Sequence, residues 1–107
     1  MASAHHYRVS RYGTTHGQNG EHHLIRGEGS SIKLWHREEP GGDKPGSTND
    51  SETLGYVIEG RVELVVDGQT IPLGPGDSCR VPRGVPHTYR VTETLTAAQV
   101  TTPATDR

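Results

Sequence analysis

The sequence has no phenylalanine and only one cysteine, one tryptophan and one methionine. A single cysteine excludes a disulfide within the chain and favours a reducing compartment. Its apolar runs are far shorter than the roughly 20 residues that cross a bilayer. The first residues, MASAHHYRVS, lack the hydrophobic region of a signal peptide. We therefore expect a cytoplasmic protein that does not insert into a membrane.

An excess of charge of either sign is also missing. The formal net charge is −2 with neutral histidines, and acidic and basic residues are interspersed. Nucleic-acid-binding proteins usually carry a basic face or stripe, so this class is excluded. The apolar residues make up 29% of the 107 residues and concentrate between Leu54 and Val100. One domain is predicted, with residues 30–107 forming its body and residues 1–29 forming an N-terminal arm and the first strands packed on it.

The chain has no helical periodicity of useful length, whereas 14 glycines and 7 prolines divide it into short alternating or β-branched segments. This pattern predicts an all-β sandwich or barrel. Strands are expected near residues 5–11, 22–27, 30–38, 53–59, 61–66, 69–73, 78–82, 87–92 and 95–101. The polar segments 11–20 and 37–52 are predicted to be loops.

Two turns are predicted between the central strands. Asp67-Gly68 separates two apolar runs, and this pair suits a two-residue hairpin turn with positive φ at both positions. Glu59-Gly60 is expected to reverse the chain in a similar way, which would give a meander from residue 54 to residue 73. Pro72 cannot donate a backbone hydrogen bond, so it should mark either an edge strand or the point where the chain leaves the sheet.

The segment GDSCRVPRGVPH, residues 76–87, carries a recognisable spacing. Gly76, Pro82, Gly84 and His87 fit the second motif of the cupins, G-x5-P-x-G-x2-H-x3-N, and Val91 replaces its final asparagine. The chain therefore resembles a cupin. The resemblance implies a β-barrel of the double-stranded β-helix, or jelly-roll, type, built from two packed antiparallel sheets with an extended N-terminal arm.

The first cupin motif, G-x5-H-x-H-x3–4-E-x6-G, is matched only in part. Gly60 fits its closing glycine, but Thr53 stands at the glutamate position and residues 46–51 contain no histidine. Cupins usually hold Fe, Mn, Ni or Zn with three histidines and one glutamate. The resemblance thus implies an incomplete site in which His87 and Glu52 are the candidate metal ligands, provided that a β-bulge near Ser51 turns Glu52 inward.

Strand alternation suggests which side chains face the barrel. Ile32, Leu34 and His36 share one face of their strand. If this aliphatic face lines the barrel, His36 points into the same interior as His87; the alternative is a partly buried histidine bonded to a backbone carbonyl. Trp35 lies on the opposite face, where burial at a sheet or subunit contact is favoured over stacking on a ligand. Along the next strand Thr53, Gly55 and Val57 are expected to face the cavity and Tyr56 to pack outside it. The predicted ligand pocket contains His87, His36, Thr53, Val57 and Tyr89, with Arg80 at its rim.

The remaining histidines and the cysteine have simpler interpretations. Adjacent strand residues point to opposite faces, so neither His5-His6 nor His22-His23 should chelate a metal. His16 is expected in solvent. Cys79 alternates with Val81 and is interpreted as a small buried residue.

Two classes of function remain open from the sequence. One is a small-molecule-binding or sensing barrel with an incomplete metal site. The other is an enzyme, either a metal-dependent oxygenase or isomerase with His87, His36 and Glu52 as ligands, or a metal-free isomerase with His87 as general base. A homodimer is expected, in which residues 5–11 add to the partner's sheet.

Overall fold

A computed structural model describes residues 7–17, 20–41, 44–45 and 50–103, with the backbone alone at residues 44–45. The described residues form an all-β fold with one short 3-10 helix, η2 (Arg11–Gly13). Its strands are β1 (His22–Arg26), β2 (Ser31–Glu38), β3 (Lys44–Pro45), β4 (Glu52–Val66), β5 (Gln69–Leu73), β6 (Ser78–Val81) and β7 (His87–Thr102). No helix in these ranges is long and apolar enough to span a membrane.

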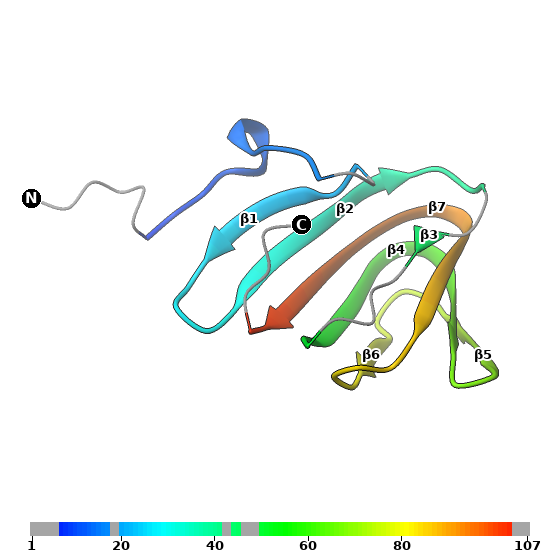
Figure 1. Cartoon of the computed structure of the whole chain (residues 1–107). Coiled ribbons are helices and arrows are strands. Elements are labelled where there is room, and N and C mark those ends of the chain that lie inside the picture. Colours follow the sequence, from blue (N-terminus) through cyan, green and yellow to red (C-terminus); the bar gives the residue numbers. More distant parts are fainter. Residues whose placement is uncertain (1–6, 18–19, 42–43, 46–49, 104–107) are drawn as a thin grey trace, which may run out of the picture.

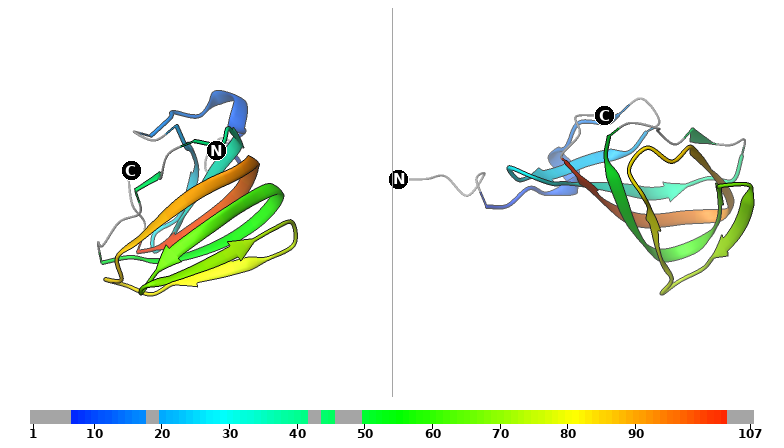
Figure 2. Two further views of the ribbon diagram at one scale, coloured as in Figure 1. Left: turned by 90° about the vertical axis from the view of Figure 1, so that its right-hand side faces the viewer. Right: turned by 60° about the horizontal axis from the view of Figure 1, so that its bottom comes forward.

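The long strands β4 and β7 form the frame of the barrel. They pair antiparallel from Glu52–Thr102 at one end to Val66–His87 at the other. The strand order is β1-β2-β7-β4-β5, with β3 added to β7 and β6 added to β4. Both long strands bend, so one half of each lies in a sheet with β2 and β6 and the other half in a sheet with β3 and β5. Figure 2 shows the two sheets curling around a common interior as an open barrel, which agrees with the predicted fold class.

The expected chain reversal at Glu59-Gly60 is wrong, because β4 continues through these residues. The register between β4 and β7 instead shifts on both sides of Glu59, which marks a bulge. Gly60 has φ +86° and lies directly against the backbone of β7, where a Cβ atom would overlap the carbonyl oxygen of Thr94. A glycine can therefore mark a bent strand as well as a turn. Residues 87–92 and 95–101, predicted as two strands, likewise belong to the one strand β7, which continues past the same register shifts.

The hairpin prediction at Asp67-Gly68 is confirmed. The two residues have φ values of 52° and 74° and join β4 to β5. Pro72 lies on β5, opposite Glu63, at the sheet edge where its missing N–H is tolerated.

The strand predicted for residues 5–11 is wrong for its described part, because residues 7–10 form no strand and Arg11 begins η2. The Ser10 hydroxyl accepts a hydrogen bond from the backbone N–H of Tyr12 at 3.2 Å, and this local bond favours a turn over sheet pairing. Residues 5 and 6 lie outside the described residues. In Figure 1 residues 7–10 run along the outer side of β1 and project beyond its end, whereas η2 lies against β1; Tyr7 and Tyr12 are 78% and 82% exposed.

The core lies between the two sheets. Its buried residues come from β4, β5, β6 and β7: Val57, Val62, Leu64, Leu73, Val81, Val91, Leu95 and Ala97. The outward residues of β4 remain exposed, with Leu54 at 46%, Tyr56 at 51% and Ile58 at 46%. The predicted alternation of β4, with Val57 inside and Tyr56 outside, is confirmed.

Candidate functional site

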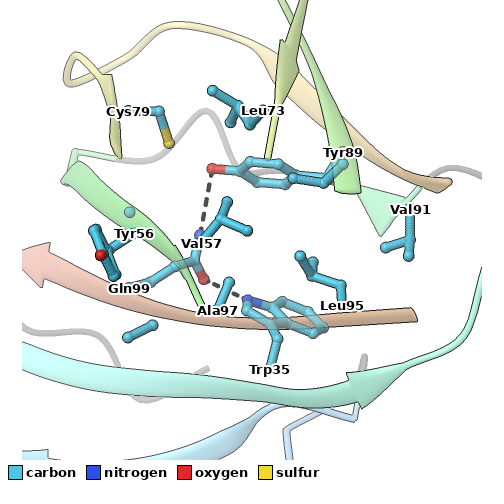
Figure 3. A pocket seen from close by; sticks show the side chains of 13 residues that line it. Trp35, Tyr56, Val57, Leu73, Cys79, Tyr89, Val91, Leu95, Ala97 and Gln99 are labelled. Carbon is cyan, nitrogen blue, oxygen red and sulfur yellow. Dashed lines mark hydrogen bonds between the residues drawn. The ribbon is translucent and has the colours of Figure 1, made fainter. Parts of the chain in front are cut away.

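A small cavity lies in the barrel interior, and we call it the barrel cavity (Figure 3). Its volume is about 40 Å³, and its wall is mainly aliphatic and aromatic. One water needs roughly 10–15 Å³ of such volume, so the cavity holds only a few waters in this conformation. The lining residues with polar side chains are Trp35, Tyr56, Cys79, Tyr89 and Gln99, of which Tyr56 is half exposed on the outer side of β4.

A chain of hydrogen bonds crosses the barrel cavity. The indole N–H of Trp35 donates to Gln99 Oε1 at 2.7 Å, and Gln99 Nε2 donates to the hydroxyl oxygen of Tyr89 at 3.3 Å. β2 and β7 position Trp35 and Gln99 on the inner face of one sheet, and Tyr89 reaches them from the opposite sheet. The chain therefore ties the two sheets together through side chains.

Tyr89 is held in its neutral form. Burial raises the pKa of its phenol well above the usual range, the nearby Cys79 adds to this increase, and the hydrogen bond from Gln99 partly opposes it. The hydroxyl accepts from Gln99 and keeps its own proton. It can therefore donate that proton to a molecule that enters the cavity.

Cys79 lies half-buried at the cavity wall. Its Sγ atom would come within 2.9 Å of a Cβ atom placed on Gly55, so glycine makes room for the sulfur. Burial raises the pKa of the Cys79 thiol, which outweighs a backbone hydrogen bond at Gly55 that lowers it. This setting disfavours the thiolate, and the predicted small buried residue is found half-buried.

Two of the five predicted pocket residues, Val57 and Tyr89, line the barrel cavity. Thr53 lies near the start of β4, where it pairs with Val81 of β6 and Thr101 of β7, and it does not line the cavity. His87 begins β7, and its Nδ1 lies 3.1 Å from the carbonyl oxygen of Val85. The His87 ring meets the Tyr89 ring edge-on, with 5.3 Å between centroids, but it lines an open depression beside the Asp67-Gly68 turn.

The expectation that His36 shares an interior with His87 is wrong, because the two faces of β2 are exchanged. Trp35 lines the barrel cavity, whereas His36 lies on the other face beside the segment that precedes β1. Arg11 Nη1 donates to His36 Nδ1 at 3.3 Å, and the His22 ring lies 6.2 Å away between centroids. Partial burial, followed by the charges of Arg11 and His22, lowers the pKa of His36. The aliphatic side of β2 thus faces outward with that of β4.

Glu52 does not join His87 at a metal site. It lies on the outward side of β4, where Arg80 Nε donates to its Oε2 at 2.6 Å. Glu52 and His87 occupy opposite ends of the β4–β7 pair. The strand register is regular from Glu52 to Val57, so no bulge there turns Glu52 inward.

Within the described ranges, no three His, Cys, Asp or Glu side chains lie close enough together to hold a metal ion. The barrel cavity offers an indole, a thiol, a phenol and an amide instead of the imidazole and carboxylate donors that suit Fe, Mn, Ni or Zn. These residues do not fit such a metal. Residues 46–49 of the first motif, as well as His5 and His6, lie outside the described residues.

Alternation alone missed Trp35 and Gln99 as cavity residues. Strand alternation predicts which side chains share a face. It does not predict which face points into the barrel, and the rule that aliphatic residues point to the core gave the wrong face for β2. The predicted exposure of His16 is confirmed, although its ring also packs against His22 with 4.3 Å between centroids.

The sequence pattern of the Cupin domain family matches residues 34–102. Among solved structures, the chain is similar to an RmlC-like cupin from Shewanella frigidimarina NCIMB 400, with a TM-score of 0.79 and 19% identity over 94% of this chain and 93% of that one. It is also similar to KdgF from Halomonas sp., with a TM-score of 0.73 and 17% identity over 84% and 85% of the chains. The cupin domain of Schizosaccharomyces pombe Cnp3 has a TM-score of 0.75 and 14% identity over 91% and 74%. No curated protein sequence matches the chain.

Proposed function

Because the chain belongs to the Cupin domain family, we propose that it is a small-molecule-binding cupin that works without the family's usual metal ligands. The observation that carries this proposal is the Trp35–Gln99–Tyr89 chain at the place where the barrel encloses its cavity. An apolar wall with a few directed polar groups is typical of a ligand pocket. The ligand would be small and neutral, with an apolar body and one hydrogen-bonding group.

Ligand entry would require local opening, because about 40 Å³ is too little for more than a few waters. The contact between Gln99 and Tyr89, at 3.3 Å, is longer than the 2.7 Å bond from Trp35 and is the weaker of the two. We propose that the ligand separates Gln99 from Tyr89 and replaces their hydrogen bond. Each partner would then bond to the ligand, so neither polar group would be left unsatisfied.

Trp35 is the only tryptophan and lines the cavity, so its fluorescence reports directly on binding. A panel of small phenols and alcohols, headed by phenol and benzyl alcohol, would be titrated against the full chain. A saturable change in Trp35 emission that weakens in Gln99→Leu is expected. Leu54→Ala, on the outward side of β4, serves as the matched control and should bind normally. No saturable change with any compound would contradict the proposal.

Elemental analysis separates this proposal from a metal-dependent enzyme. After incubation with Fe(II), Mn(II), Ni(II) or Zn(II) and removal of excess metal, the chain should keep less than one metal ion per molecule. Stoichiometric metal that is lost in His87→Ala would instead support an oxygenase or isomerase with an irregular ligand set.

We further propose that the protein acts as a homodimer, in a cytoplasmic location that its single cysteine favours. The exposed outward residues of β4 form an apolar surface together with Ile32 and Leu34 of β2. The same chain also carries two exposed apolar side chains, Tyr7 and Val9, in the segment before η2. A second copy of the chain carries the same outward face and the same N-terminal segment. A two-fold axis would therefore place the N-terminal segment of each copy against the outward face of the other.

Sedimentation equilibrium tests the dimer. Tyr56→Lys places a charge in the centre of the outward face, where it should shift the mass toward that of a monomer. Arg61→Gln, at an exposed site paired with Glu93, is the control and should leave the mass unchanged. A monomeric native chain at micromolar concentration would rule the dimer out.

A further inference from the structure

The segment before β1, residues 10–17, packs against the first two strands (Figure 1), and we call it the N-terminal strap. Two backbone hydrogen bonds join it to the start of β1. Gly17 N–H donates to the Glu21 carbonyl at 2.8 Å, and His23 N–H donates to the Thr15 carbonyl at 3.0 Å. None of the residues of η2, which lies in the strap, is buried. Because polar contacts rather than buried apolar surface hold the strap, its docking should be weak and sensitive to each contact.

Two side-chain contacts join the strap to the outward face of β1 and β2. The Thr14 hydroxyl lies 2.9 Å from Nδ1 of His22, and Arg11 Nη1 donates to Nδ1 of His36 at 3.3 Å. The His22 ring lies 4.3 Å from that of His16 and 6.2 Å from that of His36, between centroids. Three imidazoles and one guanidinium therefore share one small area where the strap covers the strands.

The contact between Arg11 and His36 requires a neutral imidazole. A guanidinium can only donate hydrogen bonds, so Nδ1 of His36 is the acceptor and the ring proton is on Nε2. A further proton on His36 would go to Nδ1, where it would face an N–H group of Arg11. An attractive contact would then become a contact between two donors of like charge.

The groups around His36 oppose its protonation. Burial has the largest effect on the pKa of this side chain and lowers it. Positive charge on three neighbours lowers the pKa further: Arg11 of the strap, His22 of β1 and Arg37 of β2. Glu59 of β4 raises the pKa, and its contribution is the smallest. Docking of the strap should therefore weaken as the pH falls from the ordinary imidazole value, about 6.5, through the lower pKa of the docked state.

We propose that the N-terminal strap is a pH-sensitive element, which protonation of His36 releases from β1 and β2. Release would uncover His22 and His36 at the border of the outward apolar surface, because His22 pairs with Leu34 in the register of the two strands. The strap is docked at neutral pH and released in mild acid. This change involves no residue of the barrel cavity and is independent of the ligand proposed for it.

Hydrogen exchange of the backbone amides tests the release, measured by NMR on the full chain at about pH 7.5 and about pH 5.0, with rates corrected for intrinsic exchange. The amides of Gly17 and His23 donate across the contact between strap and β1, so they should be protected at the higher pH and lose most of that protection at the lower one. The amides of Val57 and Gly76 are hydrogen-bonded inside the barrel and should stay protected at both.

His36→Asn separates the protonation of this one side chain from general effects of acid. The asparagine carbonyl oxygen replaces Nδ1 as an acceptor for Arg11 and does not titrate, so the strap should stay docked at both pH values. Arg11→Met removes the donor and should reduce the protection of Gly17 and His23 already at about pH 7.5. His87→Asn removes a histidine outside the cluster and should respond to pH like the native chain.

Three results would overturn the proposal. The first is equal protection of Gly17 and His23 at the two pH values in the native chain. The second is a loss of protection with the strap that extends to Val57 and Gly76, because this would be general unfolding. The third is a variant result of the wrong kind, either release of the strap by acid in His36→Asn or unchanged protection in Arg11→Met.

Discussion

Gly60→Ala tests whether β4 passes through a bulge at this position. Gly60 has φ +86°, and an added Cβ would overlap the carbonyl oxygen of Thr94 and lie 2.9 Å from that of Glu93. Left-handed backbone costs an L-residue about 1–2 kcal/mol. Forcing the two strands apart adds about 1–3 kcal/mol, as overpacking does in other interiors. We therefore expect the free energy of unfolding to fall by about 2–5 kcal/mol.

Gly68→Ala provides the matched control. Gly68 also has positive φ, at +74°, but its added Cβ would meet no atom within 4 Å. The control therefore keeps the backbone strain and removes the overlap, so its loss should be about 1–2 kcal/mol. Urea unfolding followed by far-ultraviolet circular dichroism measures both variants on the same scale. The difference between them isolates the contact of Gly60 with β7.

The result that would refute this reasoning is an equal loss in the two variants. It would mean that Gly60 has open space around it, as the two-residue turn predicted from the sequence would give. A markedly larger loss in Gly60→Ala confirms the close approach of β4 to β7. A melting temperature lower by several degrees should accompany each kcal/mol in a domain of this size.

Three further predictions concern titratable groups. Tyr89 should keep its proton in the folded protein as the pH rises above about 10, so phenolate absorbance should show one late step that Tyr89→Phe removes; a step unchanged in the variant would contradict this. Because the folded pKa is raised, the contribution of Tyr89 to stability should be fully present below the unfolded value, about 10, and should be lost as the pH rises from there through the higher folded pKa. Cys79 should react slowly with a disulfide reagent until urea unfolds the chain, because burial raises its thiol pKa; rapid labelling of the native protein would show that the wall of the barrel cavity is open. His36 has a lowered pKa, so its contribution to stability should be present above the unfolded value, about 6.5, and should be lost as the pH falls from there through the lower folded pKa. Urea midpoints should therefore depend less on pH in His36→Gln, and an unchanged pH dependence would argue against the contact with Arg11.

Much of the fold was predictable because local rules specify it. The glycine and proline spacing around His87 indicated the family, and Asp67-Gly68 indicated the hairpin that the structure contains. The alternation of β4 correctly separated Val57 from Tyr56. These features depend on residues close together in the chain, whose backbone preferences act before any tertiary contact forms.

The site was less predictable because it depends on distant partners. The sequence placed Trp35 and His36 on opposite faces of β2, which is correct, but it assigned the wrong face to the interior. Trp35 becomes a cavity residue only because β7 brings Gln99 within hydrogen-bond distance and the opposite sheet brings Tyr89. Glu52 is directed outward by its position on β4, where Arg80 pairs with it.

The sequence by itself determined the all-β class, the family and the grouping of side chains into faces, because strand alternation has a period of two wherever a strand lies. Only the tertiary structure decided which face is inside and that Gly60 bends a strand instead of ending it. Those outcomes depend on which strands pair and in what register. Pairing is a property of residues far apart in the chain, and no local pattern specifies it.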